Sequence, residues 1–396
     1  MKILQINSVY KKGSTGNIVF DIHSFLKENN VESYVCYGRG PKINEKNVFK
    51  TSSEFSAKIN KIWSKITGYV YGGNFSSTRK LIRKIKQIEP DIIHIHNLND
   101  YFVNEYKLLK FIGKNRIKTI FTLHSEQMYT GSCGYALDCL SWCKKGCKKC
   151  PHIKLSTGTK IDKTNKAFNK LSKAYKCLIK DNLKVIGCTP WLEERAKKSV
   201  LLSMFDCKTI LNGSDNSIYK LSNNSLKKEL NLENKKILLY VCPRMLDPIK
   251  GYKYIKDISD KLTNDWQIVV VGKQESNIYV AKNITYTGEI KNKEILSKYY
   301  NMADVTLILS MRECFPMVIV ESVLCGTPTI GFKCYGPDNA YPETMVKLFE
   351  YGNVDNIISH INDKFDKKEI ACLASTMVSS KVMCKNYLDT YLEFLK

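Results

Sequence analysis

The sequence predicts an α/β protein with two domains, each built on a parallel β-sheet. Three observations support this prediction. The chain has 396 residues, 43% of them hydrophobic, which is too long for one core and suits two domains of ordinary size. It opens with an apparent strand, helix and strand over residues 2–37, a βαβ unit whose strands run parallel. A second series of apolar strands and helices begins near residue 237, after a polar stretch.

The opening unit has a predicted strand at 2–7, a loop at 8–17, a helix at 18–29 and a strand at 31–37. Parallel sheets bind ligands at the carboxyl ends of their strands. The loop contains Gly13, Ser14, Thr15 and Gly16, but it lacks the full dinucleotide fingerprint. A phosphate-binding loop and a plain tight turn are therefore equally good interpretations.

Two amphipathic helices are predicted next, at 57–70 and 79–88, with apolar residues on one face and Lys or Arg on the others. Such helices either pack onto a sheet or lie at a membrane surface. Residues 1–200 contain 37 Lys and Arg against 15 Asp and Glu, whereas residues 201–396 contain 25 against 23. This asymmetry predicts a polyanionic partner, either nucleic acid or an anionic membrane face, unless the chain is simply rich in lysine.

The rest of the first domain continues the same alternation. Strands are predicted at 91–96, 118–123 and 184–188, and helices at 160–180 and 190–199. The period of two places His94 and His96 on one face of their strand, where satisfied structural histidines are the favoured interpretation. His124 directly follows the strand at 118–123.

Five cysteines lie within residues 131–151, and Cys147 and Cys150 have the two-residue spacing of a tetrahedral metal site. Many other cysteines lie in apolar segments, and the N-terminus has too short an apolar run for a signal peptide. These features favour a reducing cytoplasm. Structural zinc, disulfides and free thiols all stay open for this segment. No stretch approaches the roughly 18 apolar residues of a membrane span.

We therefore divide the chain into an N-terminal domain at 1–205 with a cysteine-rich insertion at 131–151, a linker at 206–236, and a C-terminal domain at 237–380. The second domain has predicted strands at 237–242, 267–272, 284–286, 305–309 and 328–331. A terminal helix at 381–396 has no strand after it, so it is free to cross back over the first domain.

The second domain contains the most informative stretch, a strand, loop and helix over residues 310–331. Glu313 lies in the loop and Glu321 about two helical turns further on. Pro316 suits a first helical turn, and the free amides of Phe315, Met317 and Val318 would favour a bound anion. Upstream, Arg244 and Lys250 flank a short loop and form a suitable pair for a diphosphate.

These motifs resemble those of family-4 retaining glycosyltransferases over nearly the whole chain. The matching features of the second domain are Arg244 before Lys250-Gly251, the glycine-ended strand at Gly272, the Glu313/Glu321 spacing, and Gly326-Thr327-Pro328. The first domain resembles the colanic acid and exopolysaccharide branch. It shares with that branch the loop at 13–16, the strand at 90–97, Thr122-Leu123-His124 and the cysteine insertion that ends at Pro151.

The resemblance implies the GT-B fold, two Rossmann-like domains facing across a cleft, and a role for each matching residue. Arg244 and Lys250 would bind the donor diphosphate, Glu321 the nucleotide ribose and Glu313 the donor sugar. Residues 13–16 would approach the diphosphate, His124 would lie by the reacting carbon, and Gly272 and the segment 315–318 would complete the donor site. Four cysteines match the insertion and are the candidate zinc ligands: Cys133, Cys139, Cys147 and Cys150.

The predicted function is hexose transfer from a UDP- or GDP-sugar to a glycan acceptor. We expect this acceptor to be lipid-linked and to belong to exopolysaccharide, capsule or O-antigen synthesis. We expect no catalytic metal, no nucleic-acid partner, and a cytoplasmic enzyme that lies against the inner face of the cell membrane. Two alternatives use the same features differently. One is a basic zinc-containing protein that binds nucleic acid, and the other is a GT-B epimerase or phosphorylase.

Overall fold

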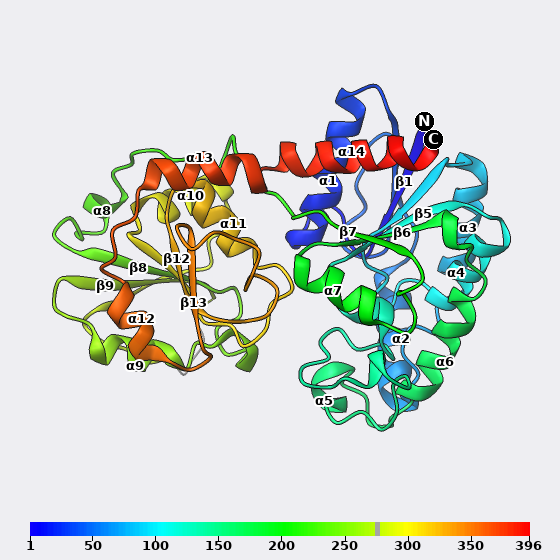
Figure 1. Ribbon diagram of the computed structural model, residues 1–396, viewed down its shortest axis with the longest axis horizontal. Helices are drawn as coiled ribbons and strands as arrows, with labels where there is room; N and C mark the ends of the chain where they lie inside the picture. Colours follow the sequence, from blue (N-terminus) through cyan, green and yellow to red (C-terminus); the bar gives the residue numbers. More distant parts are fainter. Residues whose placement is uncertain (274–277) are drawn as a thin grey trace. The chain divides into compact units, whose positions relative to one another are not determined.

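A computed structural model describes residues 1–273 and 278–396 (Figure 1). The described chain divides into two compact units. Unit 1 comprises Met1–Ile210 together with Cys384–Lys396, and unit 2 comprises Leu211–Met383. Each unit is built on one sheet in which neighbouring strands are parallel. The predicted α/β class with two Rossmann-like domains is therefore confirmed.

The sheet of unit 1 has seven strands in the order β3-β2-β1-β4-β5-β6-β7. Their bounds are β1 Lys2–Asn7, β2 Glu32–Tyr37, β3 Val48–Lys50, β4 Ile92–Ile95, β5 Lys118–Leu123, β6 Leu183–Gly187 and β7 Asp206–Thr209. The order reverses between β1 and β4. At such a switch point the loops that follow the two strands diverge to opposite faces and leave room for a ligand at the carboxyl edge.

The longer helices of unit 1 are α1 Gly13–Glu28, α2 Glu54–Thr67, α3 Phe75–Ile88, α4 Glu105–Lys114, α6 Thr164–Tyr175, α7 Pro190–Lys198 and α14 Ser380–Leu395, whose first turn belongs to unit 2. Several begin at a side-chain cap. Asn104 caps α4 by accepting from the Lys107 amide, and Thr189 caps α7 just before Pro190.

Among the described residues of unit 2, the sheet has six strands in the order β10-β9-β8-β11-β12-β13. Their bounds are β8 Lys236–Val241, β9 Trp266–Val271, β10 Ile284–Gly288, β11 Val305–Ile308, β12 Thr329–Phe332 and β13 Val346–Phe349. Helices α9 Tyr254–Lys261 and α12 Val354–His360 cover one face, and α10 Lys293–Met302, α11 Met317–Leu324 and α13 Lys367–Val378 cover the other (Figure 1). The switch point of this sheet lies between β8 and β11.

The structure differs from the sequence-based elements in several places. Helix α1 begins at Gly13, where φ is +64°, so the predicted loop at 8–17 is shorter than expected. The helix predicted at 160–180 covers only Thr164–Tyr175. The short strands β3, β7 and β13 were not predicted, because three or four mixed residues give little periodic signal. Strand β7 and the short helix α8, Leu226–Glu229, both lie within the expected linker at 206–236.

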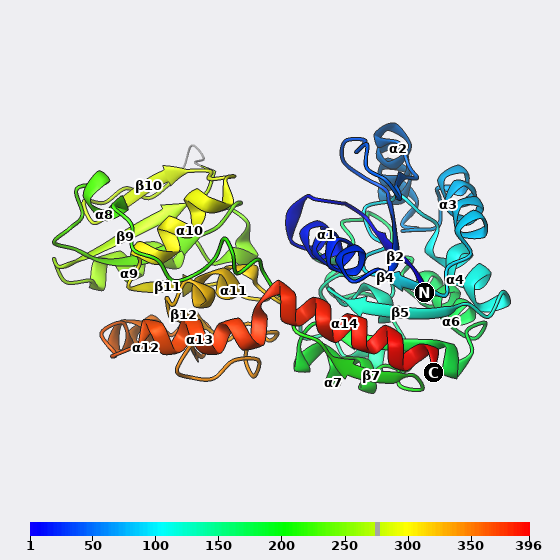
Figure 2. The ribbon, with the colours of Figure 1, turned by 90° about the horizontal axis from the view of Figure 1, so that it is seen from above.

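Helix α14 belongs mostly to unit 1, although unit 2 separates it from the rest of that unit in the sequence. It runs beside β5 in Figure 2. The Tyr391 hydroxyl lies 2.6 Å from Nδ1 of His94 on β4, and the Tyr387 hydroxyl lies 2.9 Å from Oγ1 of Thr122 on β5. The helix thus closes the core of unit 1 over two central strands.

Within residues 1–273 and 278–396, none of the helices is both long and apolar enough to cross a membrane.

Candidate functional site

The best-defined candidate site lies at the carboxyl edge of the unit 2 sheet, at its switch point. Lys250 ends the short 3₁₀ helix Pro248–Lys250 that follows β8, and Glu313 lies in the loop after β11. The Met311 amide donates to the Ile249 carbonyl at 2.7 Å, which ties the two loops together. This sheet topology brings together residues that are 63 positions apart in the sequence.

Lys250 and Glu313 form a close ion pair, with Nζ 2.6 Å from Oε1. The side chains are only 28% and 12% exposed, so the pair is mostly shielded from solvent. Burial alone would lower the pKa of the Lys250 ammonium, but the charge and hydrogen bond of Glu313 raise it above its usual value. Lys250 therefore remains a cation at neutral pH. Arg244 is separate from this pair: its side chain is 77% exposed and lies 3.5 Å from Asp247.

Two glycines allow the strand ends to approach closely at this edge. Gly251 has φ +78°, and a Cβ there would lie 1.8 Å from the Leu309 carbonyl oxygen. A Cβ on Gly272, which follows β9, would lie 1.9 Å from the carbonyl oxygen of Cys242. Any side chain at either position would displace backbone. Gly272 therefore has a packing role at the site edge, and its predicted ligand contact stays a prediction.

The loop that carries Glu313 is held by a segment that the sequence analysis missed. The Glu313 amide donates to the Cys334 carbonyl at 2.9 Å, and the Gly336 amide donates back to the Glu313 carbonyl at 3.0 Å. Next to it, Arg312 is buried with its guanidinium 4.5 Å from the centre of the Tyr335 ring. The Gly336-Pro337-Asp338 turn was the available signal, but a turn motif does not reveal its distant partner.

Helix α11 begins directly beyond this loop, and Pro316 is its N-cap residue rather than part of the first turn. Phe315 and Pro316 are buried, whereas Met317 and Val318 are partly exposed. The first amides of a helix have no intrahelical acceptor, and they carry the positive end of the helix dipole. This helix end therefore presents donors next to the Lys250–Glu313 pair.

Glu321 lies one helical turn beyond Met317 on α11 and is partly exposed. The Tyr300 hydroxyl donates to its Oε2 at 2.9 Å. Burial raises the pKa of Glu321 to about 7, although the Tyr300 hydrogen bond favours the carboxylate. Tyr300 is fully buried and is a second residue that the sequence analysis missed, because a tyrosine in an amphipathic helix looks like core.

In unit 1, residues 13–16 form the first turn of α1 rather than a loop before it. The Lys11 amide donates to the Gly16 carbonyl at 3.0 Å, and a Cβ on Gly16 would lie 3.2 Å from Val9. Gly13 and Ser14 are exposed, and Asn7 Nδ2 donates to Thr15 Oγ1 at 3.5 Å. This turn follows β1 and so lies at the switch point of the first sheet.

Three histidines form a contact series across the same sheet. Nδ1 of His96 lies 3.1 Å from Nε2 of His124, and the ring centres of His94 and His96 are 3.9 Å apart. Gln5 Oε1 and Thr122 Oγ1 provide further partners, at 3.1 Å from His96 and 2.7 Å from His94. Burial lowers the pKa of His124 to about 4 and the pKa values of His94 and His96 well below their usual value. All three imidazoles are therefore neutral at pH 7. Only His124 is partly exposed.

The four candidate zinc ligands lie together, and all are free cysteines: Cys133, Cys139, Cys147 and Cys150. They line one cavity of about 20 Å³, roughly the space of one water molecule, together with His152. Burial raises the pKa values of Cys133 and Cys147 to about 12, so these two are neutral thiols. Across residues 1–273 and 278–396, no three metal-ligand side chains lie close enough to hold an ion. The zinc site therefore stays a prediction, and elemental analysis of the purified protein would test it.

Residues 222–369 match the family model of glycosyl transferases group 1. WcaC of Escherichia coli strain K12, assigned as a glycosyl transferase of colanic acid biosynthesis, is 22% identical over 83% of this chain and 82% of its own. A 41.2 kDa protein from the cps region of Klebsiella pneumoniae is 23% identical over 99% of both chains.

Solved structures resemble the whole chain at low identity. Sucrose-phosphate synthase from Thermosynechococcus elongatus has a TM-score of 0.68 at 14% identity, with 99% of this chain and 98% of the other covered. Anabaena HepE, solved with UDP and glucose, has a TM-score of 0.65 at 15% identity, with 99% and 100% covered. These similarities confirm the GT-B type of fold. Residues 222–369 therefore form a glycosyl transferases group 1 domain, and the chain that carries it is a glycosyltransferase.

Proposed function

We propose that this protein is a family-4 retaining transferase that moves a hexose from a UDP- or GDP-sugar to a glycan acceptor. The observation that carries the proposal is the shielded Lys250–Glu313 pair at the switch point of the second sheet. Glu321 lies eight residues beyond Glu313, on the helix whose N-terminus faces the same loop. A cation, two carboxylates and the free amides of a helix N-terminus together suit a polyol that carries phosphate.

Each group in the site has a distinct role in the proposal. Lys250 and the exposed Arg244 bind the diphosphate, which gains negative charge as it leaves the sugar. A fixed cation there stabilises the transition state more than the ground state. Glu313 orients Lys250 and meets the sugar hydroxyls, and Glu321 accepts hydrogen bonds from the ribose. The amides of Phe315, Met317 and Val318 complete the donor contacts at the start of α11.

No side chain is assigned as a general base. In the proposed reaction the acceptor attacks the face from which the diphosphate departs, and the departing phosphate takes the acceptor proton. His124 is neutral at pH 7, so it serves as a hydrogen-bonding group near the reacting carbon rather than as a cation. The turn at 13–16 approaches the diphosphate with its backbone amides.

We place the acceptor among the lipid-linked glycans of exopolysaccharide, capsule or O-antigen synthesis, at the inner face of the cell membrane. The relatives assigned to colanic acid synthesis and to a cps region support this choice. The excess of basic residues in the first 200 positions also supports an anionic membrane surface as the partner of unit 1.

Nucleotide-sugar binding and transfer test the proposal directly. A thermal-shift series with UDP- and GDP-sugars should show one that stabilises the fold, because a ligand that binds only the native state raises its stability. Lys250→Ala and Glu321→Ala should abolish transfer and keep the fold. Lys256→Ala is the matched control, since that lysine is exposed on α9 and forms an ion pair with Asp260. Normal turnover by Lys250→Ala would contradict the site, and an inverted anomer in the product would contradict the retaining mechanism.

A further inference from the structure

Helix α2 presents its large apolar side chains to solvent instead of burying them. Phe55, Ile59, Ile62 and Ile66 are 50–74% exposed, and Trp63 is 40% exposed. At 100° per residue these five positions fall within one narrow stripe along the helix. A contiguous apolar stripe of this size marks an interaction surface.

The opposite face of α2 is small, polar and hydrogen-bonded to the protein. Ala57 and Ser64 are buried. Asn60 donates to Asn74 Oδ1 at 2.7 Å and accepts from the Asn74 amide at 3.0 Å, and the Ser56 hydroxyl donates to Asn74 Oδ1 at 3.3 Å. Turning the apolar stripe inward would break these bonds and bury a bulky face where small residues now fit. The outward orientation is therefore built into the fold.

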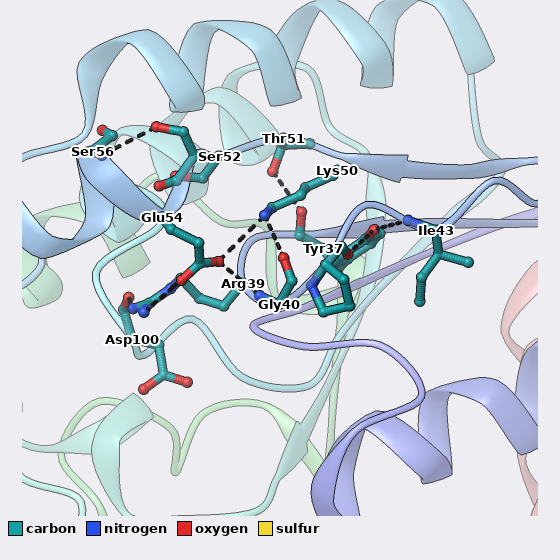
Figure 3. Close-up of polar contacts among 12 residues, drawn as sticks. Tyr37, Arg39, Gly40, Ile43, Lys50, Thr51, Ser52, Glu54, Ser56 and Asp100 are labelled. Atoms are coloured by element: carbon teal, nitrogen blue, oxygen red, sulfur yellow. Dashed lines mark hydrogen bonds and ion pairs between the residues drawn. The ribbon is translucent and has the colours of Figure 1, made fainter.

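The first turn of α2 is also fixed in place (Figure 3). The Glu54 carboxylate accepts from Arg39 Nε at 2.9 Å and from the Gly40 amide at 2.8 Å, and it pairs with Lys50 at 3.3 Å. Ser53 caps the helix by accepting from the Ser56 amide at 3.1 Å. The apolar stripe is thus held on a rigid element.

Lysines surround this stripe. Lys58, Lys61 and Lys65 are exposed on the flank of α2. At the other edge, the Trp63 ring meets the Tyr69 ring at 5.8 Å, and Tyr69 lines a pocket of about 670 Å³. Phe75, which is 56% exposed, lines the same pocket. Five lysines are among the other residues that line it: Lys107, Lys110, Lys114, Lys170 and Lys173.

We infer that this surface, the stripe of α2 with the lysine-lined pocket, docks unit 1 onto an anionic phospholipid bilayer. The apolar side chains enter the boundary between headgroups and acyl chains, as in other interfacial helices. The lysines lie at the level of the lipid phosphates, where each adds electrostatic attraction. A second copy of the chain is a poorer occupant, because pairing this surface with itself would bring like charges together.

This inference builds on the proposed function, since an enzyme for lipid-linked acceptors must meet the membrane. Its test measures lipid binding without transfer, so the two can fail separately. Binding of a nucleotide sugar by the same preparations reports on the proposed function alone.

Flotation of the full chain with vesicles provides the test. Vesicles of phosphatidylcholine with phosphatidylglycerol should bind the protein, and vesicles of phosphatidylcholine alone should bind it at least about tenfold more weakly. Ile62→Ser with Ile66→Ser should weaken binding to the anionic vesicles by about tenfold or more, because two exposed apolar side chains are lost. Lys170→Gln with Lys173→Gln should weaken binding to the anionic vesicles by about tenfold at low salt. This difference from the wild type should disappear at high salt.

Matched controls separate this surface from general stickiness and charge. Val280 and Ile295 are exposed apolar residues of unit 2, so changing both to Ser should leave vesicle binding unchanged. Changing Lys256 and Lys261, exposed lysines on α9, to Gln should have the same neutral result. The fluorescence emission of Trp63 should shift to shorter wavelength on anionic vesicles. Loss of this shift in Trp63→Phe would assign it to Trp63.

Equal binding to both kinds of vesicle, or unchanged binding by the isoleucine variant, would overturn the inference. A dimer in solution that Ile62→Ser with Ile66→Ser converts to a monomer, without vesicle binding by the wild type, would also overturn it and assign the stripe to self-association. Loss of vesicle binding with intact nucleotide-sugar binding supports the surface as described.

Discussion

The carboxyl edges of the two sheets are built from different chemistry. In unit 2, the edge carries a charged cluster in which Lys250 and Glu313 lie 2.6 Å apart and are held by loops on both sides of a switch point. In unit 1, the corresponding edge carries neutral imidazoles, with His96 and His124 3.1 Å apart. One edge suits a ligand that is anionic, and the other suits hydrogen bonding without charge.

The difference shows how burial acts on groups that have partners and groups that do not. Burial would discharge Lys250, but an adjacent carboxylate keeps it charged. The histidines have no carboxylate in the contacts described above, so burial leaves them neutral. Substitutions at four positions test this contrast, and the one at Lys250 has the largest expected effect.

Lys250→Ala should have the largest effect. It removes the shielded cation and leaves the Glu313 carboxylate without its partner, which disfavours an anionic ligand. We expect transfer to fall by about 1,000-fold or more, as for the loss of a group that stabilises developing charge. Turnover with the preferred nucleotide sugar measures this effect. Lys256→Ala should retain full activity. An equal loss in that control would contradict a specific role of Lys250 in transfer.

Glu321→Gln should change the pH dependence of nucleotide binding. The pKa of Glu321 is about 7 in the fold, so the wild-type carboxylate forms as pH rises from 6 to 8. Affinity that depends on this carboxylate should rise by up to about tenfold over that range. Calorimetric titration at several pH values measures the rise, and Glu321→Gln should show a flat profile. The exposed Glu350 provides a control, because Glu350→Gln should keep the wild-type slope.

His124→Gln should have a moderate effect on transfer, and His124→Ala a larger one of about 10- to 100-fold. Glutamine keeps a hydrogen-bonding group, which is all that a neutral imidazole supplies in this proposal. The rate of the wild-type enzyme should not follow a histidine titration above pH 5, because the pKa of His124 is about 4. A rate that rises or falls around pH 6.5 and loses this dependence in His124→Gln would contradict the neutral role.

His94→Leu should affect stability more than chemistry. It strands the Tyr391 hydroxyl in the core and leaves the Thr122 hydroxyl with Tyr387 alone, at a cost of about 1–3 kcal/mol in unfolding free energy. The folded-state pKa of His94 lies below its usual 6.5. The contribution of neutral His94 to the unfolding free energy is therefore fully present above pH 6.5, and it is lost as the pH falls below that value. Urea unfolding at pH 7.5 and 5.5 should show a smaller acid loss in His94→Leu. The partly exposed His360 serves as the control, and an equal change in His360→Leu would contradict this account.

Much of the fold could be predicted from the sequence because strands and helices alternate with clear apolar patterns. The orientation of a helix was harder to predict, as the adjacent helices α2 and α3 demonstrate. Both combine lysines with an apolar stripe, but α3 buries Leu81, Ile85 and Ile88, whereas α2 exposes its stripe. The pattern defines a face but not its partner. Only contacts with distant residues, such as those between Asn60 and Asn74, decide which face turns inward.

The candidate site divides in the same way. Local motifs identified Lys250, Glu313 and Glu321, because their spacing around a strand and a helix is visible in the sequence. The support of these residues was not visible. Tyr300 reaches the site because α10 packs against α11, and the segment from Cys334 to Gly336 reaches it because β12 pairs with β11. No local spacing encodes either contact.

The position of α14 has a consequence for the order in which the protein forms during translation. Residues 211–383 are synthesised between β7 and the helix that covers His94 and Thr122. While unit 2 emerges from the ribosome, those strands lack their last layer, and domains that have emerged tend to fold as soon as they can. Unit 1 is therefore begun first and completed last. A product truncated inside unit 2 would display an uncovered core surface, which makes it a ready target for chaperones and proteases.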